Sequence, residues 1–67
     1  MANKEVVLEF VGKYHTYQVV RHPGGILSAP TFYVVRDDGK SWGSYSSPDR
    51  AAHAAKEKAG PGVYERS

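Results

Sequence analysis

The most constraining feature of the sequence is a hairpin signal in residues 31–46. Two runs rich in β-branched and aromatic residues, TFYVVR and SWGSYS, flank the Asp-Asp-Gly-Lys segment at 37–40. Asp-Gly between such runs is a strong short-range indication of a β-hairpin. We predict strands over about 31–36 and 41–46, with Arg36 opposite Ser41 and Val35 opposite Trp42. In this register one face carries Tyr33, Val35 and Trp42, and the other carries Phe32, Val34 and Arg36.

A second hairpin is predicted nearer the N-terminus. Strands at about 5–11 and 14–21 are dense in apolar and β-favouring residues and are separated by Gly12-Lys13. Glycine at the first central position suits a type II′ turn, which would pair Val11 with Tyr14 and Phe10 with His15. The apolar side chains that this register places on a common face are Val6, Leu8, Phe10, Tyr17 and Val19. That face is the expected core side of the sheet.

A helix is predicted over about 48–59. Ser47 is a suitable N-cap, Pro48 fits the first helical position, and Asp49 complements the helix dipole. Gly60-Pro61 ends the helix. The helix carries a narrow stripe of small side chains that lets it lie close to the sheet: Ala51, Ala52, Ala55 and Ala59. Residues 22–30, with two prolines and a Gly-Gly pair, are expected to form a loop, and residues 60–67 a flexible tail.

These elements predict one small α+β domain over residues 1–67. Its antiparallel sheet would have three or four strands, from the two hairpins, packed against one C-terminal helix. The chain has no cysteine for a disulfide or a thiolate zinc site, so the core must rest on aromatic and β-branched residues. No stretch has the apolar length of a signal peptide or a membrane span, and we therefore expect a cytoplasmic protein without membrane contact.

The sequence carries no pattern typical of a catalytic or metal centre. The three histidines, His15, His22 and His53, are spread over a strand, a loop and the helix without partners at ligand-like spacing. There is no nucleophile elbow, and Gly24-Gly25 lacks the lysine and the helix start of a phosphate loop. We therefore expect a binding protein without a metal or a small-molecule cofactor rather than an enzyme.

The segment from Tyr33 to Ala59 resembles the end of the AP2-type DNA-binding domain, which occurs in related form at the N-termini of phage integrases. The positions that carry the resemblance are Arg36-Asp37, Gly39-Lys40, Trp42-Gly43, Tyr45, Ser47 and Ala51-Ala52. The resemblance implies that Tyr33, Val35 and Trp42 point to the helix. It also implies that Arg36, Lys40 and Ser41 lie on or beside the sheet face that such domains press into the major groove. The same hairpin and helix also resemble small bacterial domains of unknown function that continue into a final strand, for which residues 62–67 are barely long enough.

Two functions remain as alternatives. The first is sheet-mediated binding of double-stranded DNA, and its expected contact residues are Lys13, Arg21, Arg36, Lys40 and Ser41. A net charge of +2 and a pI near 9.0 fit an anionic partner. The second is protein–protein interaction, as in a homodimer or a small accessory or inhibitory protein of a phage or mobile element. It would use apolar side chains on the outer sheet face: Val7, Val11, Phe32 and Val34.

Overall fold

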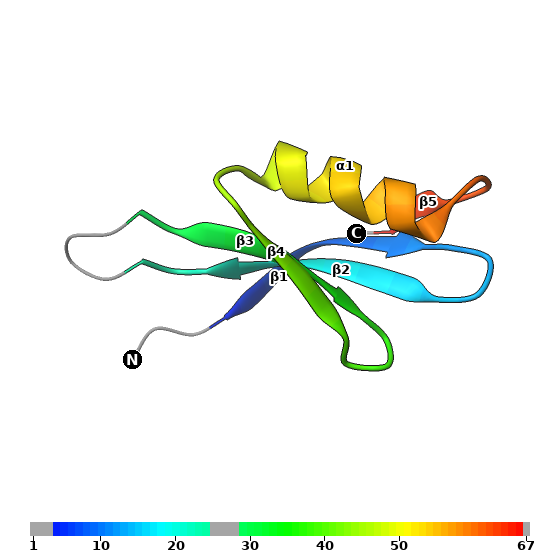
Figure 1. The fold of residues 1–67 in the computed structure, drawn as a ribbon, viewed down its shortest axis with the longest axis horizontal. Coiled ribbons are helices and arrows are strands. Elements are labelled where there is room, and N and C mark those ends of the chain that lie inside the picture. The colour runs from blue at the N-terminus through cyan, green and yellow to red at the C-terminus, as the bar shows by residue number, and fades with distance from the viewer. Residues whose placement is uncertain (1–3, 25–28, 67) are drawn as a thin grey trace.

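The fold is an antiparallel sheet with one helix on one of its faces (Figure 1). The computed structural model describes residues 4–24 and 29–66. Its elements are β1 (Glu5–Val11), β2 (Thr16–His22), β3 (Thr31–Arg36), β4 (Ser41–Tyr45), α1 (Pro48–Ala59) and β5 (Tyr64–Arg66). The strands lie in the order β4-β3-β2-β1-β5. The predicted α+β class, with two hairpins before the helix, is confirmed.

The residues after the helix form a strand, which corrects the prediction of a flexible tail and of a C-terminal helix. β5 pairs antiparallel with β1, with Tyr64 opposite Val11, and becomes the fifth strand of the sheet. Gly60 and Gly62 have φ angles of +82° and +84°, a region that is accessible to glycine at little cost. These two glycines allow the chain to reverse after α1 and run along the edge of β1.

The loop predicted over residues 22–30 is described only in part. His22 is the last residue of β2, and residues 25–28 lie outside the described residues.

The core lies between α1 and the inner face of the sheet, which is the face toward the helix. Phe10, Val19 and Val34 are the largest fully buried side chains. Ala51 and Ala55 of the helix are also fully buried, so the alanine stripe faces the sheet as predicted. Complete burial of a Phe or Val side chain stabilises the fold by about 1.5–3 kcal/mol.

The register of β1 and β2 differs from the predicted one but preserves most of the predicted core. Phe10 lies opposite Tyr17 rather than His15, and the Gly12 amide donates to the His15 carbonyl at 2.9 Å across a Lys13-Tyr14 turn. The pairing is displaced by two residues, so the same side chains still share a face. Val6 is the exception. A β-bulge between Val6 and Leu8 turns Val6 to the outer face of the sheet, where it is 51% exposed.

The register of β3 and β4 reverses the predicted faces. Val34 lies opposite Trp42, and Val35 lies opposite Ser41. The amide of Gly39 donates to the Arg36 carbonyl at 2.9 Å, and the amide of Arg36 donates to the Lys40 carbonyl at 2.7 Å. The loop therefore has three residues and is closed by Gly39 at a φ of +92°.

The predicted pairing was one residue away from this register, and such a shift moves a side chain to the opposite face. The inner face consequently carries Phe32, Val34 and Arg36 together with Trp42, whereas Tyr33 and Val35 point outward.

Candidate functional site

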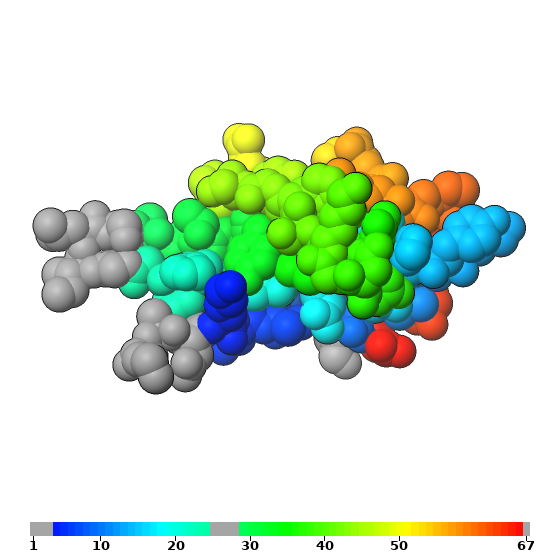
Figure 2. All heavy atoms as spheres, turned by 60° about the horizontal axis from the view of Figure 1, so that its bottom comes forward, coloured from blue at the N-terminus to red at the C-terminus, as the bar shows by residue number. Residues whose placement is uncertain are grey.

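One end of the molecule is built from three segments that are distant in the sequence. These are the β1–β2 turn, the β3–β4 turn and the last turn of α1 (Figure 2). The β1–β2 turn packs directly on the helix, because a Cβ atom on Gly12 would lie 3.0 Å from the Cβ of Ala59. The two turns are joined by His15 Nδ1 and Asp37 Oδ1, which are 2.9 Å apart. The hydroxyl of Tyr17 donates to the Lys58 carbonyl at 3.4 Å.

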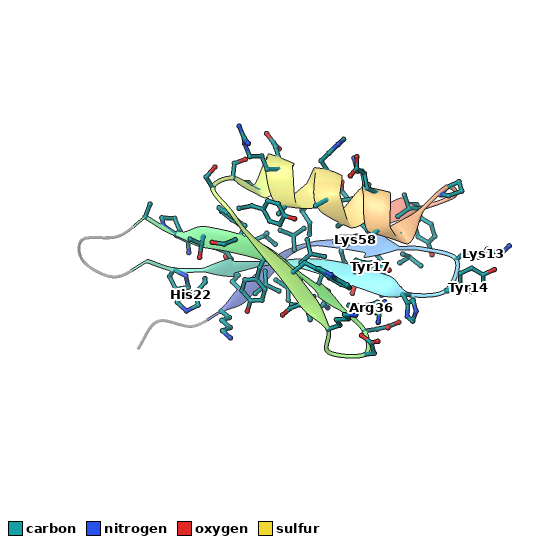
Figure 3. All side chains as sticks on the ribbon, in the orientation of Figure 1. Lys13, Tyr14, Tyr17, His22, Arg36 and Lys58 are labelled. Carbon is teal, nitrogen blue, oxygen red and sulfur yellow. The ribbon has the colours of Figure 1, made fainter. Side chains whose placement is uncertain are left out.

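Three cationic side chains surround the indole of Trp42 at this end. The Nζ atom of Lys58 lies 4.3 Å from the ring centroid, the guanidinium carbon of Arg36 lies 5.4 Å away, and Nζ of Lys40 lies 5.8 Å away. They come from α1, β3 and the β3–β4 turn. The ring of Tyr17 is 6.2 Å from that of Trp42, and Figure 3 shows Lys58, Tyr17 and Arg36 between the helix and the turn. Cations within about 6 Å of an indole face are attracted to its π electrons.

We call the surface formed by Lys13, Arg36, Lys40 and Lys58 the basic end. Lys13 belongs to it because it lies in the β1–β2 turn, and Figure 3 shows it at the extremity of the molecule.

The two carboxylates of the basic end are engaged in holding the turns. Asp38 accepts from Arg36 Nε at 2.9 Å and from the Lys40 amide at 3.1 Å, and the Arg36 guanidinium lowers the pKa of this carboxyl. Asp37 accepts from the Thr16 amide at 3.1 Å, and this hydrogen bond and that of His15 lower the pKa of Asp37. Lys13, Lys40 and Lys58 form no salt bridge with any residue within 4–24 and 29–66. The ammonium groups of these three lysines are therefore available to an external anion.

The structure brings together some of the residues predicted to contact DNA and separates others. Lys13, Arg36 and Lys40 belong to the basic end. Arg36 lies on the inner face of the sheet, opposite Tyr17, rather than on the outer face that the sequence predicted. Ser41 lies opposite Val35 on the outer face, and Arg21 lies near the far end of β2, opposite Glu5 and Phe32.

Lys58 was missing from the prediction. Its signal in the sequence was the basic last turn of the helix, but only the register of β3 and β4 places Trp42 within reach of it.

The apolar residues predicted as a protein interface do not form a common surface. Phe32 is 8% exposed and Val34 is completely buried, because both face α1. Val7 packs against the same core. Val11 is half-buried and lies between Thr16 of β2 and Tyr64 of β5. The expectation that Phe32 and Val34 are exposed is wrong, because the pairing of β3 with β4 differs by one residue from the predicted pairing.

The outer face of the sheet carries polar groups that are already paired with one another. Arg66 Nε donates to Glu9 Oε1 at 2.5 Å, and Gln18 Nε2 donates to Glu9 Oε2 at 3.3 Å. The hydrogen bond from Arg66 is the main cause of a lowered pKa at Glu9. These groups line a shallow depression of about 470 Å³. This face therefore presents fewer available cations than the basic end.

Among residues 4–24 and 29–66, no three His, Cys, Asp or Glu side chains lie close enough to hold a metal ion. Over the same residues, α1 is too short and too polar to span a membrane.

Comparison with family models, with curated proteins and with solved structures finds no match to this chain.

Proposed function

We propose that this protein is a non-catalytic module that binds nucleic acid, with double-stranded DNA as a partner, through the basic end. The observation that supports this proposal is the arrangement of three cations around the indole of Trp42, two from the β3–β4 hairpin and one from the last turn of α1. Lysine and arginine contacts with phosphates release condensed counterions and supply much of the affinity of DNA-binding proteins. The AP2-type resemblance favours the same partner, although the cations lie at one end of the molecule rather than across its outer sheet face.

The basic end is suited to an extended polyanion because its positions are fixed relative to one another. The contact of Gly12 with Ala59 and the His15–Asp37 pair hold both turns and the helix end together. Lys40 and Lys58 are exposed, so their ammonium groups can exchange water for phosphate oxygens. Groups that are ordered before binding lose less entropy when the ligand arrives.

The test is a fluorescence-anisotropy titration of labelled duplex DNA with the double variant Lys40→Ala plus Lys58→Ala. A matched control is Lys4→Ala plus Arg50→Ala, which also removes two positive charges, but from exposed positions outside the basic end. We expect wild-type affinity to fall as salt rises. The Lys40 and Lys58 variant should bind more weakly, and its logarithmic salt dependence should decrease by about 0.9 for each phosphate that it no longer neutralises.

Equal affinities of the two double variants would contradict the basic end as the binding surface. An absence of binding by the wild type at low salt would contradict the function itself.

A further inference from the structure

Tyr14 is an aromatic residue whose side chain does not pack in the core. It is 80% exposed, which is the largest value among the large hydrophobic residues that the structure describes as exposed. It is the second residue of the Lys13-Tyr14 turn, and Figures 2 and 3 show this turn projecting at the basic end. The Nζ atom of Lys13 lies 5.4 Å from the centroid of the Tyr14 ring. A cation and an aromatic ring thus stand together at the extremity of the hairpin.

The turn that carries Tyr14 is braced on both sides. The hydrogen bond from the Gly12 amide to the His15 carbonyl closes it, and Gly12 lies against Ala59 of the helix. His15 is paired with Asp37 of the neighbouring turn. The two residues that flank the Lys13-Tyr14 pair are therefore fixed to the rest of the domain, and the ring is presented from a supported position.

We infer that Tyr14 is a base-stacking residue and that DNA with unpaired bases binds more tightly than fully paired DNA. This inference rests on the proposed function, since Lys13 and the other cations of the basic end hold the adjacent phosphates. In a paired duplex each internal base is covered by its neighbours, so its flat face is closed to a protein ring. An unpaired base has a free face, and stacking on an aromatic side chain is tolerant of sequence because every base has such a face. The ligand class is thus a DNA strand whose bases are locally unpaired.

The test compares two labelled duplexes of equal length, one fully paired and one with a central run of mismatched, unpaired thymines. Both carry the same number of phosphates, so a difference in affinity reports contact with bases. We expect the wild type to bind the mismatched duplex at least about fivefold more tightly, the lower end of what one stacked base contributes. Tyr14→Ala should remove this preference and leave affinity for the paired duplex within about twofold. Tyr14→Phe, which keeps the ring, should retain the preference.

Tyr64→Ala is the matched control, because Tyr64 is also exposed, at 58%, but lies on β5. A preference for unpaired bases that persists in Tyr14→Ala, or that Tyr64→Ala removes equally, would overturn the assignment of Tyr14.

Equal binding of both duplexes by the wild type, with the salt dependence and the effect of the Lys40 and Lys58 variant intact, would overturn this inference and leave the proposed function standing. An absence of binding to either duplex would overturn both.

Discussion

Neighbouring valines on β3 allow a direct test of the sheet register. Val34 is completely buried between the sheet and α1, and Val35 is half-buried on the outer face opposite Ser41. Val34→Ala removes two carbons from a filled core, which costs about 1.6 kcal/mol at roughly 0.8 kcal/mol per methylene. The remaining cavity adds to this loss, so we expect a total decrease of about 2–3 kcal/mol in the free energy of unfolding. For Val35→Ala we expect less than about 1 kcal/mol, because part of this side chain already contacts water.

The difference is measurable by urea denaturation of both variants and the wild type, followed by far-UV circular dichroism. A chain of 67 residues has an unfolding free energy of roughly 3–10 kcal/mol. With a denaturant slope of about 1 kcal/mol per molar, the midpoint of Val34→Ala should fall by about 2–3 M relative to the wild type. If Val35→Ala is as destabilising as Val34→Ala or more so, the register and the assignment of the inner face are wrong.

Three further predictions concern β4, the start of α1 and the β3–β4 turn. Gly43 has a φ of +87°, and a Cβ there would overlap the Tyr45 ring. Gly43→Ala should therefore lower the unfolding free energy by about 1–3 kcal/mol. An unchanged thermal midpoint would contradict this reason for a glycine at position 43. The Ser47 hydroxyl accepts from the Arg50 amide at 3.3 Å, so Ser47→Ala should cost about 1 kcal/mol and Ser47→Asp much less, as measured by urea denaturation; equal losses would argue against capping. The Arg36 guanidinium lowers the pKa of Asp38 in the folded state. The stabilising effect of the ionised Asp38 is therefore fully present above the pKa of an unfolded aspartate, about 3.9, and disappears as pH falls. Thermal midpoints measured between about pH 5 and 2 should therefore fall less steeply for Asp38→Asn than for the wild type, and parallel curves would refute the linkage.

The elements of this fold follow from local signals in the sequence. The helix bounds agree with the prediction because Ser47 and Pro48 define its start and Gly60 its end. The strands β1 and β3 also have the predicted bounds, since their β-branched and aromatic runs end at Gly12 and at the Asp-Asp-Gly segment. Each of these signals acts within a few residues, where backbone preference and hydrogen bonding decide the outcome.

The pairing of the strands could not be predicted with the same certainty, because it depends on turn geometry at single-residue resolution. A three-residue loop closed by Gly39 and the two-residue loop of Lys13-Tyr14 each fit the sequence as well as the predicted loops did. The error at β3 and β4 exchanged the faces of Val34 and Val35 and so placed Phe32 on the wrong side. β5 was missed because three residues after two glycines carry little strand signal, and their pairing with β1 is a tertiary contact.

The candidate site shows the same division. Lys13, Arg36 and Lys40 were recognisable as basic residues near turns, but their common location with Lys58 depends on how the helix packs. Trp42 lies beside Arg36, Lys40 and Lys58. Its position opposite Val34 follows from the register of β3 and β4. Without the correct strand pairing, the sequence therefore indicates which residues are charged but not the surface that they form together.

The most direct test of the proposed DNA-binding surface uses the intrinsic fluorescence of Trp42, the single tryptophan of the chain. DNA that binds at the basic end must displace or reorient the cations around this indole, whereas DNA bound elsewhere leaves them in place. We predict that unlabelled duplex DNA changes the Trp42 emission, with a midpoint equal to that of the anisotropy titration, and that added salt reverses the change. Binding detected by anisotropy without any change in Trp42 emission would contradict the basic end as the site.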